Sequence, residues 1–398
     1  MSEIRVTNVI GENGSSPVNF TQGINMSGIV TATSFVPTVG QLSHRNLIIN
    51  GDMRIAQRGT SSTSSGYYTV DRFNNFFTGT DESPTQAQVD VASGTTPYTL
   101  GFRKALRITN GNQTSGAGAS DFISIQYKFE AQDIANSGWN YTSASSFITL
   151  SFWIKSSVAQ TFKGYIRSLD GTEQNYPFET GSLTADTWTK ITKTISGNSN
   201  LTFNNDNGEG LQITIAAFWG TDYTDSSVTE NAWAAYSGST RMKDNTSTWY
   251  TTNDATLELT GFQLEVGSVA TPFEHRSFAD ELKRCQRYYY ASSRWMGGSR
   301  GSGTARSFVT DFGMRLTGSQ VSGGTYTNEA TSGGDVVYIG TNATRQNSDV
   351  NANSLGASST SSNGSLQLSV TVGYALGSGD NGIATGLFIN GFTVDHEL

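Results

Sequence analysis

Most of the chain follows the alternation of apolar and polar residues that is typical of β-strands. Between positions 105 and 267, strand-length runs alternate between apolar and polar residues. Runs expected to form central strands are almost entirely apolar instead. Clusters of Asn, Asp, Gly and Ser separate the runs, as expected for turns. We therefore predict an all-β protein whose centre is an antiparallel jelly-roll sandwich. The clearest runs are Ala105–Thr109, Phe122–Phe129, Phe147–Ser156, Phe162–Ser168, Trp188–Ser196, Leu211–Gly220 and Ala255–Gly267.

Two stretches depart from this pattern and predict helices. One is Glu130–Ala135. In the other, residues 277–291, apolar side chains recur at helical spacing, and Ser277 with Asp280 resembles an N-terminal capping box. We expect this junction helix to pack against one of its neighbouring domains. Its predicted apolar face consists of Phe278, Leu282, Cys285, Tyr288 and Tyr289.

The two ends of the chain differ from its centre. Residues 1–44 hold two alternating stretches around a turn-rich spacer, too few strands to bury a core alone. The segment must therefore pair with copies of itself or with a partner, unless it is a frayed tail. Residues 292–398 are rich in Gly, Ser and Thr, and their thin apolar content predicts a β domain that gains its core by trimerisation. The predicted domains are thus 1–44, 45–276, 277–291 and 292–398.

Composition narrows the possible partners and chemistry. The 44 glycines against 6 prolines and the 35% hydrophobic content favour many short strands joined by polar turns. A net charge of −8 argues against nucleic acid as the main partner. The first residues show no signal peptide, and no apolar run reaches the length of a membrane span, so we expect synthesis in a cytoplasm without membrane insertion. The single cysteine, Cys285, excludes an intrachain disulfide.

Five separated motifs, together with the order in which they occur, resemble bacteriophage tail-fibre proteins over residues 44–290. The resemblance implies a homotrimeric virion fibre made in the bacterial host cytoplasm. Residues 1–44 would attach to the phage tail or another virion protein, and Gly28–Phe35 resembles the stems of trimeric fibres. The motifs are His44–Ser61, Tyr67–Phe73, Ile148–Ser156, Trp188–Ser196 and Gly261–Tyr289, and the final Val394–Leu398 is similar to the ends of that group.

The same resemblance implies a function in adsorption. The central domain is similar to carbohydrate-binding jelly-roll modules, and the distal domain would meet a glycan or protein on the host cell surface. Three sites on one trimer would bind by avidity, without turnover. Two alternatives stay open: a structural virion adaptor or decoration protein that binds no receptor, and a polysaccharide-degrading tailspike.

Sugar recognition requires flat aromatic faces for the C–H surfaces of the ring and polar side chains for its hydroxyls. Aromatic residues between predicted strands, near Asp and Asn, fit this need in the stretch 219–253, although several of them would equally plug the ends of a sandwich. In the distal domain, two aromatic residues are further candidates. The candidate receptor- or glycan-binding residues are Trp219, Tyr223, Trp233, Tyr236, Trp249, Trp295 and Tyr338.

Catalytic and metal sites are weakly marked. A glycosidase needs two carboxylates, and Asp222 with Asp225 or Asp81 with Glu82 could form such pairs, but turns produce the same spacing. Asn204–Gly210 has the composition of a calcium loop, yet also that of a plain hairpin turn. We therefore expect no enzyme activity, no metal and no cofactor.

Overall fold

The computed structural model describes residues 44–292, with side chains through Tyr290, the backbone of strands β14 to β22 between residues 295 and 395, and Glu397. The prediction for residues 1–44 therefore lies outside the described residues except at His44. The homotrimer stays a prediction. No helix in the described part of the chain is long and apolar enough to span a membrane.

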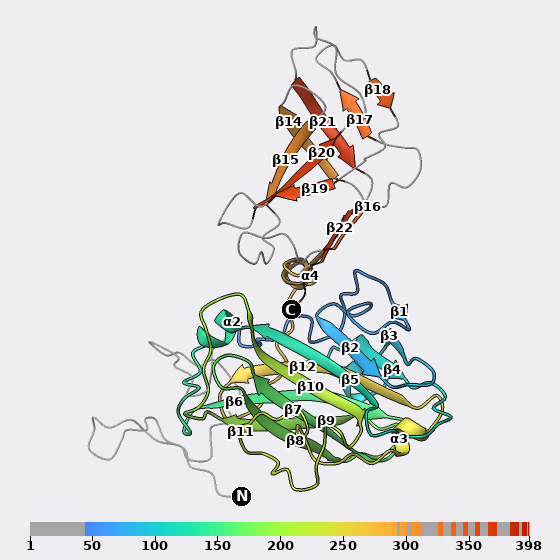
Figure 1. The fold of residues 1–398 in the computed structure, drawn as a ribbon, viewed down its shortest axis with the longest axis vertical. Coiled ribbons are helices and arrows are strands. Elements are labelled where there is room, and N and C mark those ends of the chain that lie inside the picture. Colours follow the sequence, from blue (N-terminus) through green and yellow to red (C-terminus); the bar gives the residue numbers. More distant parts are fainter. Residues whose placement is uncertain are drawn as a thin grey trace, which may run out of the picture. The chain divides into compact units, whose positions relative to one another are not determined.

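Two six-stranded antiparallel sheets form the central domain and pack face to face (Figure 1). Along the chain, the strands pass back and forth between the sheets, and each sheet buries one apolar face against the other. This confirms the predicted β-sandwich. In order across sheet A, the strands are β1 (Ser61–Ser62), β3 (Thr85–Asp90), β4 (Lys104–Thr109), β12 (Thr256–Val266), β6 (Phe147–Ser156) and β9 (Thr189–Ser196). In order across sheet B, they are β11 (Ala234–Ala235), β8 (Gln174–Ser182), β7 (Thr161–Ser168), β10 (Glu209–Trp219), β5 (Phe122–Glu130) and β2 (Phe73–Thr78).

Every clear strand run of the sequence corresponds to a strand of the sandwich. Strands β1, β2, β3, β8 and β11 are additional. β1 and β11 are only two residues long, and the others do not show a strong apolar alternation: β3, for example, reads TQAQVD. Its side chains are mostly half-buried, and it pairs with β4 on one side and with the two-residue strand β1 on the other. Backbone pairing, rather than composition, makes this segment a strand.

The core lies between the sheets and is built from the inward-facing positions of each strand. On β6 these are Ile148, Leu150, Phe152 and Ile154, all at most 1% exposed. The intervening residues of β6 face outward, as the two-residue period requires. Phe152 stacks on Phe262 of β12, with ring centroids 4.6 Å apart and planes at 13°.

Four short helices connect the strands: α1 (Thr96–Thr99), α2 (Ala131–Ala135), α3 (Thr248–Thr251) and α4 (Phe278–Gln286). The predicted cap of α4 is confirmed, since the Asp280 amide donates to Ser277 Oγ at 3.1 Å. The helix ends at Gln286, however, and not at residue 291. Phe278 was predicted on the apolar face but is 56% exposed, at the first position of the helix.

The tyrosines after α4 begin a strand rather than continuing the helix. β13 (Tyr289–Ser292) pairs with β22 (Phe392–Asp395), which also pairs with β16 (Thr325–Asn328). Strands occur along the whole of this region, so the predicted β structure over 292–398 is confirmed for the described backbone. The other strands are β14 (Trp295–Arg300), β15 (Ala305–Asp311), β17 (Val336–Ile339), β18 (Arg345–Ser348), β19 (Leu355–Ser358), β20 (Ser365–Thr371) and β21 (Ile383–Ile389).

Candidate functional site

A β-bulge in the middle of β12 creates an opening on the outer face of sheet A. Thr260 pairs with Trp153 and Gln263 pairs with Ser151, so two residues of β12 lie opposite one residue of β6. One of the two is Gly261, at φ +65°, a conformation that glycine adopts without strain. Because Gly261 has no side chain, the outer face of the sheet is hollow at this point.

Residues from two connecting segments form the walls of this hollow, which we call the sheet A cleft. Its volume is about 370 Å³. Trp153 is half-buried, and Lys190 lies opposite it on β9. Phe102 also lines the cleft and is 1% exposed. The cleft is lined by Leu100, Phe102, Ser151, Trp153, Lys190, Gly261, Ala270, Thr271, Pro272, Phe273 and His275.

Three aromatic rings form one wall of the sheet A cleft. The Phe102 ring centroid is 5.0 Å from that of Phe273 and 5.3 Å from that of His275, and Phe273 and His275 are 4.9 Å apart. The imidazole is fixed by a 2.9 Å contact between its Nε2 and the carbonyl oxygen of Leu100. The wall therefore combines apolar ring surface with one titratable ring.

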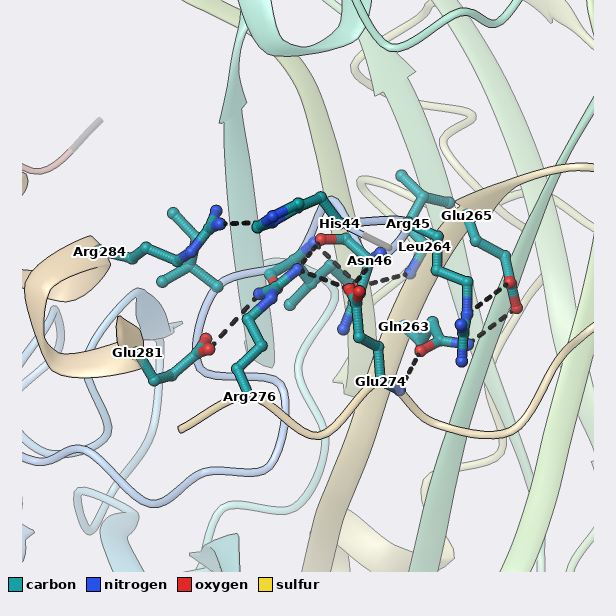
Figure 2. Close-up of polar contacts among 12 residues, drawn as sticks. His44, Arg45, Asn46, Gln263, Leu264, Glu265, Glu274, Arg276, Glu281 and Arg284 are labelled. Atoms are coloured by element: carbon teal, nitrogen blue, oxygen red, sulfur yellow. Dashed lines mark hydrogen bonds and ion pairs between the residues drawn. The ribbon is translucent and has the colours of Figure 1, made fainter. Parts of the chain in front are cut away.

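Hydrogen bonds attach the segment 268–276 to sheet A. This segment carries Phe273 and His275, two of the three rings of the wall. The Thr271 amide and hydroxyl donate to the two carboxylate oxygens of Glu265 at 2.8 and 2.6 Å, and the Glu274 amide donates to Gln263 Oε1 at 2.8 Å. Figure 2 shows these acceptors on β12, with Arg45 placed beside Glu265 at 3.7 Å. The rim of the cleft is thus held by the sheet itself.

Arg276 fastens the end of the same segment. Its guanidinium contacts Glu274 at 3.1 Å and Glu281 of α4 at 3.4 Å (Figure 2). Partial burial alone would raise the pKa of Glu274, but the amide of Asn46 and the charge of Arg276 outweigh it and hold that pKa below its ordinary value. Glu274 is therefore a carboxylate at neutral pH, and Arg276, which contacts both Glu274 and Glu281, links the cleft rim to α4.

The groups on the cleft surface match the requirements of sugar recognition. Trp153 and Phe273 offer ring surface for C–H groups, while Ser151, Thr271 and Lys190 supply hydroxyl and ammonium groups for sugar hydroxyls. None of the described residues lining the cleft carries a carboxylate. The pair of carboxylates that glycoside hydrolysis requires is therefore not part of this lining.

Two of the predicted aromatic residues lie on the outer face of sheet B, where they hold a loop in place. Trp219 is 1% exposed and packs with Tyr223, their centroids 5.3 Å apart. Arg241 lies 4.6 Å from the Trp219 ring, and Met242, 0% exposed, closes the same cluster. Trp219 is thus enclosed by protein and offers no ring face to a ligand, while Tyr223 is half-buried.

The next three predicted residues do not join one site. Trp233 is half-buried, and its indole N–H donates to the Ser196 carbonyl at 2.8 Å. Tyr236 is half-buried beneath the Arg167 guanidinium, 3.7 Å from its ring. Trp249 is 0% exposed and belongs to the core, so it offers no binding surface.

The distal candidates are placed by backbone only. Trp295 is the first residue of β14, and Tyr338 lies in β17. Their side chains fall outside what the structure describes, so their predicted role stays a prediction.

A second hollow, of about 360 Å³, lies beside α2 and α4. Its described lining includes His44, Arg45, Asp133 and Arg284 and no Trp, Tyr or Phe. Arg284 contacts His44 Nδ1 at 3.0 Å across one side of it. Without a stacking surface, this hollow fits sugar binding less well than the sheet A cleft.

Other polar candidates stabilise loops: Asp81 and Glu82 link two separate loops, and Asp206 stabilises a turn. Asp81 accepts from the Ser115 amide at 2.6 Å, and Glu82 accepts from the Asn112 amide at 2.7 Å. In the proposed calcium loop, Asp206 accepts from the Gly208 amide at 2.9 Å, which is the bonding of a plain turn. Within the described residues, no group of three or more His, Cys, Asp or Glu could hold a metal ion.

The sheet A cleft was missed at the sequence level because its parts are far apart in the chain. Trp153 lies within the predicted strand Phe147–Ser156, whereas Phe102 and Phe273 lie in connecting segments. One local signal existed: the Gly-Phe pair at 261–262 interrupts the alternation of β12, as a bulge does.

Comparison with known proteins gives distant structural likenesses. No protein-family model matches the chain, and no curated protein sequence matches it. The enzymatically active domain of a tailspike protein from bacteriophage CBA120 aligns at 9% identity and a TM-score of 0.29, covering 56% of this chain and 21% of that chain. This chain thus spans about a fifth of the tailspike chain's length.

Two bacterial sugar-binding modules align over a similar share of the chain. The N-terminal cellulose-binding domain of a Cellulomonas fimi β-1,4-glucanase has 11% identity and a TM-score of 0.26, covering 55% of this chain and 99% of that chain. A family 11 carbohydrate-binding module from Clostridium thermocellum has 10% identity and a TM-score of 0.25, covering 53% and 98%. At these values, the sandwich fold rests on the sheet topology described above.

Proposed function

We propose that this protein is a virion fibre of a bacteriophage and binds a glycan of the host cell surface through the sheet A cleft. The observation that carries the glycan part is the cleft itself: an aromatic wall beside hydroxyl and ammonium groups, on a rigid sheet. The resemblance of residues 44–290 to tail-fibre proteins supports the virion part.

The proposed mechanism is adhesion without turnover. A sugar ring would stack on Trp153 or Phe273, and Ser151, Thr271 and Lys190 would bond its hydroxyls. With a volume of about 370 Å³, the cleft would take one or two sugar units, which predicts weak binding at a single site. Trimerisation through residues 1–44 or the distal domain would raise the avidity, since a second contact on the same particle is intramolecular.

The test combines binding to cells with binding to purified glycans. Fluorescently labelled protein is titrated onto candidate host cells, with phage adsorption competition in the same assay. The purified lipopolysaccharide and capsular polysaccharide of those cells are then immobilised and the titration is repeated. Saturable binding that blocks adsorption, and binding to one of the polysaccharides, are the expected results. No binding by a sample that contains the folded sandwich would favour the structural virion role.

Matched aromatic variants locate the site. Trp153→Ala should weaken polysaccharide binding at least about tenfold, because it removes the stacking surface. Trp153→Phe keeps a ring and should retain most of the affinity. Tyr236→Ala removes a half-buried ring on the opposite sheet and serves as the control. If Tyr236→Ala abolishes binding and Trp153→Ala does not, the site is the loop over sheet B instead. Release of new reducing ends from the polysaccharide would favour the tailspike alternative.

A further inference from the structure

The chain returns to the sandwich after its distal segment. β13 and β22 pair antiparallel, with Tyr289 opposite Asp395 and Ser292 opposite Phe392. The segment 293–391 therefore begins and ends at the same end of the β13–β22 ladder. Two residues beyond this ladder comes Glu397, whose side chain is 5% exposed.

Glu397 meets two arginines of the sandwich. One carboxylate oxygen accepts from Arg72 Nη1, and the other accepts from Arg58 Nη1 at 3.3 Å. The side chains of Arg72 and Arg58 are 1% and 7% exposed. All three charged groups are thus withdrawn from water, where an ion pair is screened least.

The sandwich holds both arginines ready for a carboxylate. The Arg72 guanidinium lies 3.4 Å from the ring centroid of Tyr288 and donates from Nη2 to the Lys128 carbonyl at 2.6 Å. Arg58 lies 3.7 Å over the Tyr289 ring. A guanidinium stacked in this way presents its edge donors in one direction.

The backbone conformation of Arg72 is also unusual. Arg72 has φ +73°, in the left-handed region that side chains other than glycine rarely adopt. Such a conformation persists only where the surroundings require it, and it is enriched at binding sites.

Charge complementarity favours the carboxylate. Asp71, 0% exposed, lies 3.9 Å from Arg58. Glu397 and Asp71 thus bring two carboxylates to the two buried guanidinium groups, and removal of Glu397 would take one of them away. Burial alone would lower the pKa of Arg72, but the carboxylate of Glu397 outweighs it, and the pKa lies well above its ordinary value.

We propose that Arg58 and Arg72 form a carboxylate-binding site for the chain's own tail, and that Glu397 in this site closes the β13–β22 ladder. Residues 293–391 are then an insertion fastened at both of its ends. The ligand class is a side-chain carboxylate on an extended peptide. This inference does not depend on glycan binding.

Hydrogen exchange of the full chain tests the proposal. Glu397→Gln removes the charge and keeps the shape, so amides of Tyr289–Ser292 and Phe392–Asp395 should exchange at least about tenfold faster than in the wild type. Amides of β6 and β12 should keep their rates. Glu397→Asp retains the carboxylate on a shorter side chain and should give an intermediate rate. Asp222→Asn, at an exposed carboxylate, makes the same change in net charge and should have no effect.

Two results would overturn the proposal. One is exchange of the β13 and β22 amides at wild-type rates in Glu397→Gln. The other is an equal acceleration in β6 and β12, which would make Glu397 a general stabiliser of the sandwich. A double-mutant comparison adds a second criterion: Arg58→Gln should accelerate ladder exchange less in the Glu397→Gln background than alone. Additive effects would contradict a shared site.

Discussion

The α-carbon of Gly261 faces the indole of Trp153 so closely that a Cβ added at Gly261 would lie 3.1 Å from Trp153 Cδ1. The same Cβ would lie 2.7 Å from Cζ of Phe102. The cleft on sheet A therefore exists because one strand bulges at a residue without a side chain. Its shape depends on this residue as much as on the aromatic rings.

Replacing Gly261 should both strain the backbone and narrow the cleft. In Gly261→Ala, the left-handed φ of +65° costs about 1–2 kcal/mol of unfolding free energy. The contacts with Phe102 and Trp153 add to this, and displacement of the indole should weaken glycan binding. Urea denaturation and the polysaccharide titration measure the two effects.

Gly94 offers a matched control, because its φ is +85° and nothing lies within 4 Å of a Cβ added there. Gly94→Ala should show the backbone cost alone, with unchanged binding. Equal loss of stability and of binding in both variants would show that the crowding at Gly261 has no effect on the cleft.

Trp249 should act on stability alone. It is fully buried, and its indole N–H donates to the Thr256 carbonyl at 3.1 Å. Trp249→Ala should lower the unfolding free energy by about 3–5 kcal/mol, the range for removing a large buried ring. Binding measured per folded molecule should be unchanged. Trp233→Ala, which removes a half-buried ring, should lower the unfolding free energy by clearly less. An equal loss in the two variants would show that Trp249 is not a core residue in solution.

The stability that Asp71 contributes to the sandwich should fall as the pH rises from acid to neutral. Burial, partly offset by hydrogen bonds from Gln57, raises the pKa of Asp71 from 3.8 to about 6. The folded state therefore holds this proton more tightly than the unfolded state. Its contribution is fully present below pH 3.8 and is lost as the pH rises through about 6.

Comparison with Asp71→Asn isolates that contribution. Since one pKa unit corresponds to about 1.4 kcal/mol, the stability of the wild type relative to this variant should fall by about 3 kcal/mol between pH 3.5 and pH 7. Denaturation at several pH values measures it. A difference that does not change with pH would show that Asp71 titrates normally.

Cys285 should be unreactive in the folded protein. Its side chain is 0% exposed, and burial raises the pKa of the thiol well above its ordinary value. Because the thiolate is the nucleophile, alkylation by iodoacetamide at pH 8 should be at least about a hundredfold slower than for a free cysteine. Addition of urea should restore the reaction. Fast native labelling would show that α4 opens readily.

The sheets could be predicted from the sequence because a central strand carries its own signal. On β6 the inward positions Ile148, Leu150, Phe152 and Ile154 are all apolar, and the period of two follows directly. Pairing partners carry no such local signal. β13 was predicted as the end of a helix because Tyr288 and Tyr289 continue the helical spacing, but backbone pairing with β22, about a hundred residues later, makes Tyr289 the start of a strand.

The sheet A cleft, the proposed binding surface, was harder to predict because contacts between distant segments carry no local sequence signal. Trp219 and Trp153 both end up near sheet surfaces, and nothing local distinguishes them. The loop after β10 folds back over Trp219 and encloses it, while the bulge at Gly261 leaves Trp153 partly open. Which aromatic ring stays accessible depends on contacts between distant segments.

The β13–β22 ladder also determines how force would pass through the molecule. A pull on residues 293–391 acts on both strands at the same end of the ladder, so it neither unzips one strand from the other nor shears them past each other. The load divides between two paths: a covalent one through β13 into α4, and one through β22 that ends at the non-covalent ion pairs of Glu397. Each path carries only part of the tension, so a tip attached in this way should withstand more force than one joined to the sandwich by a single strand.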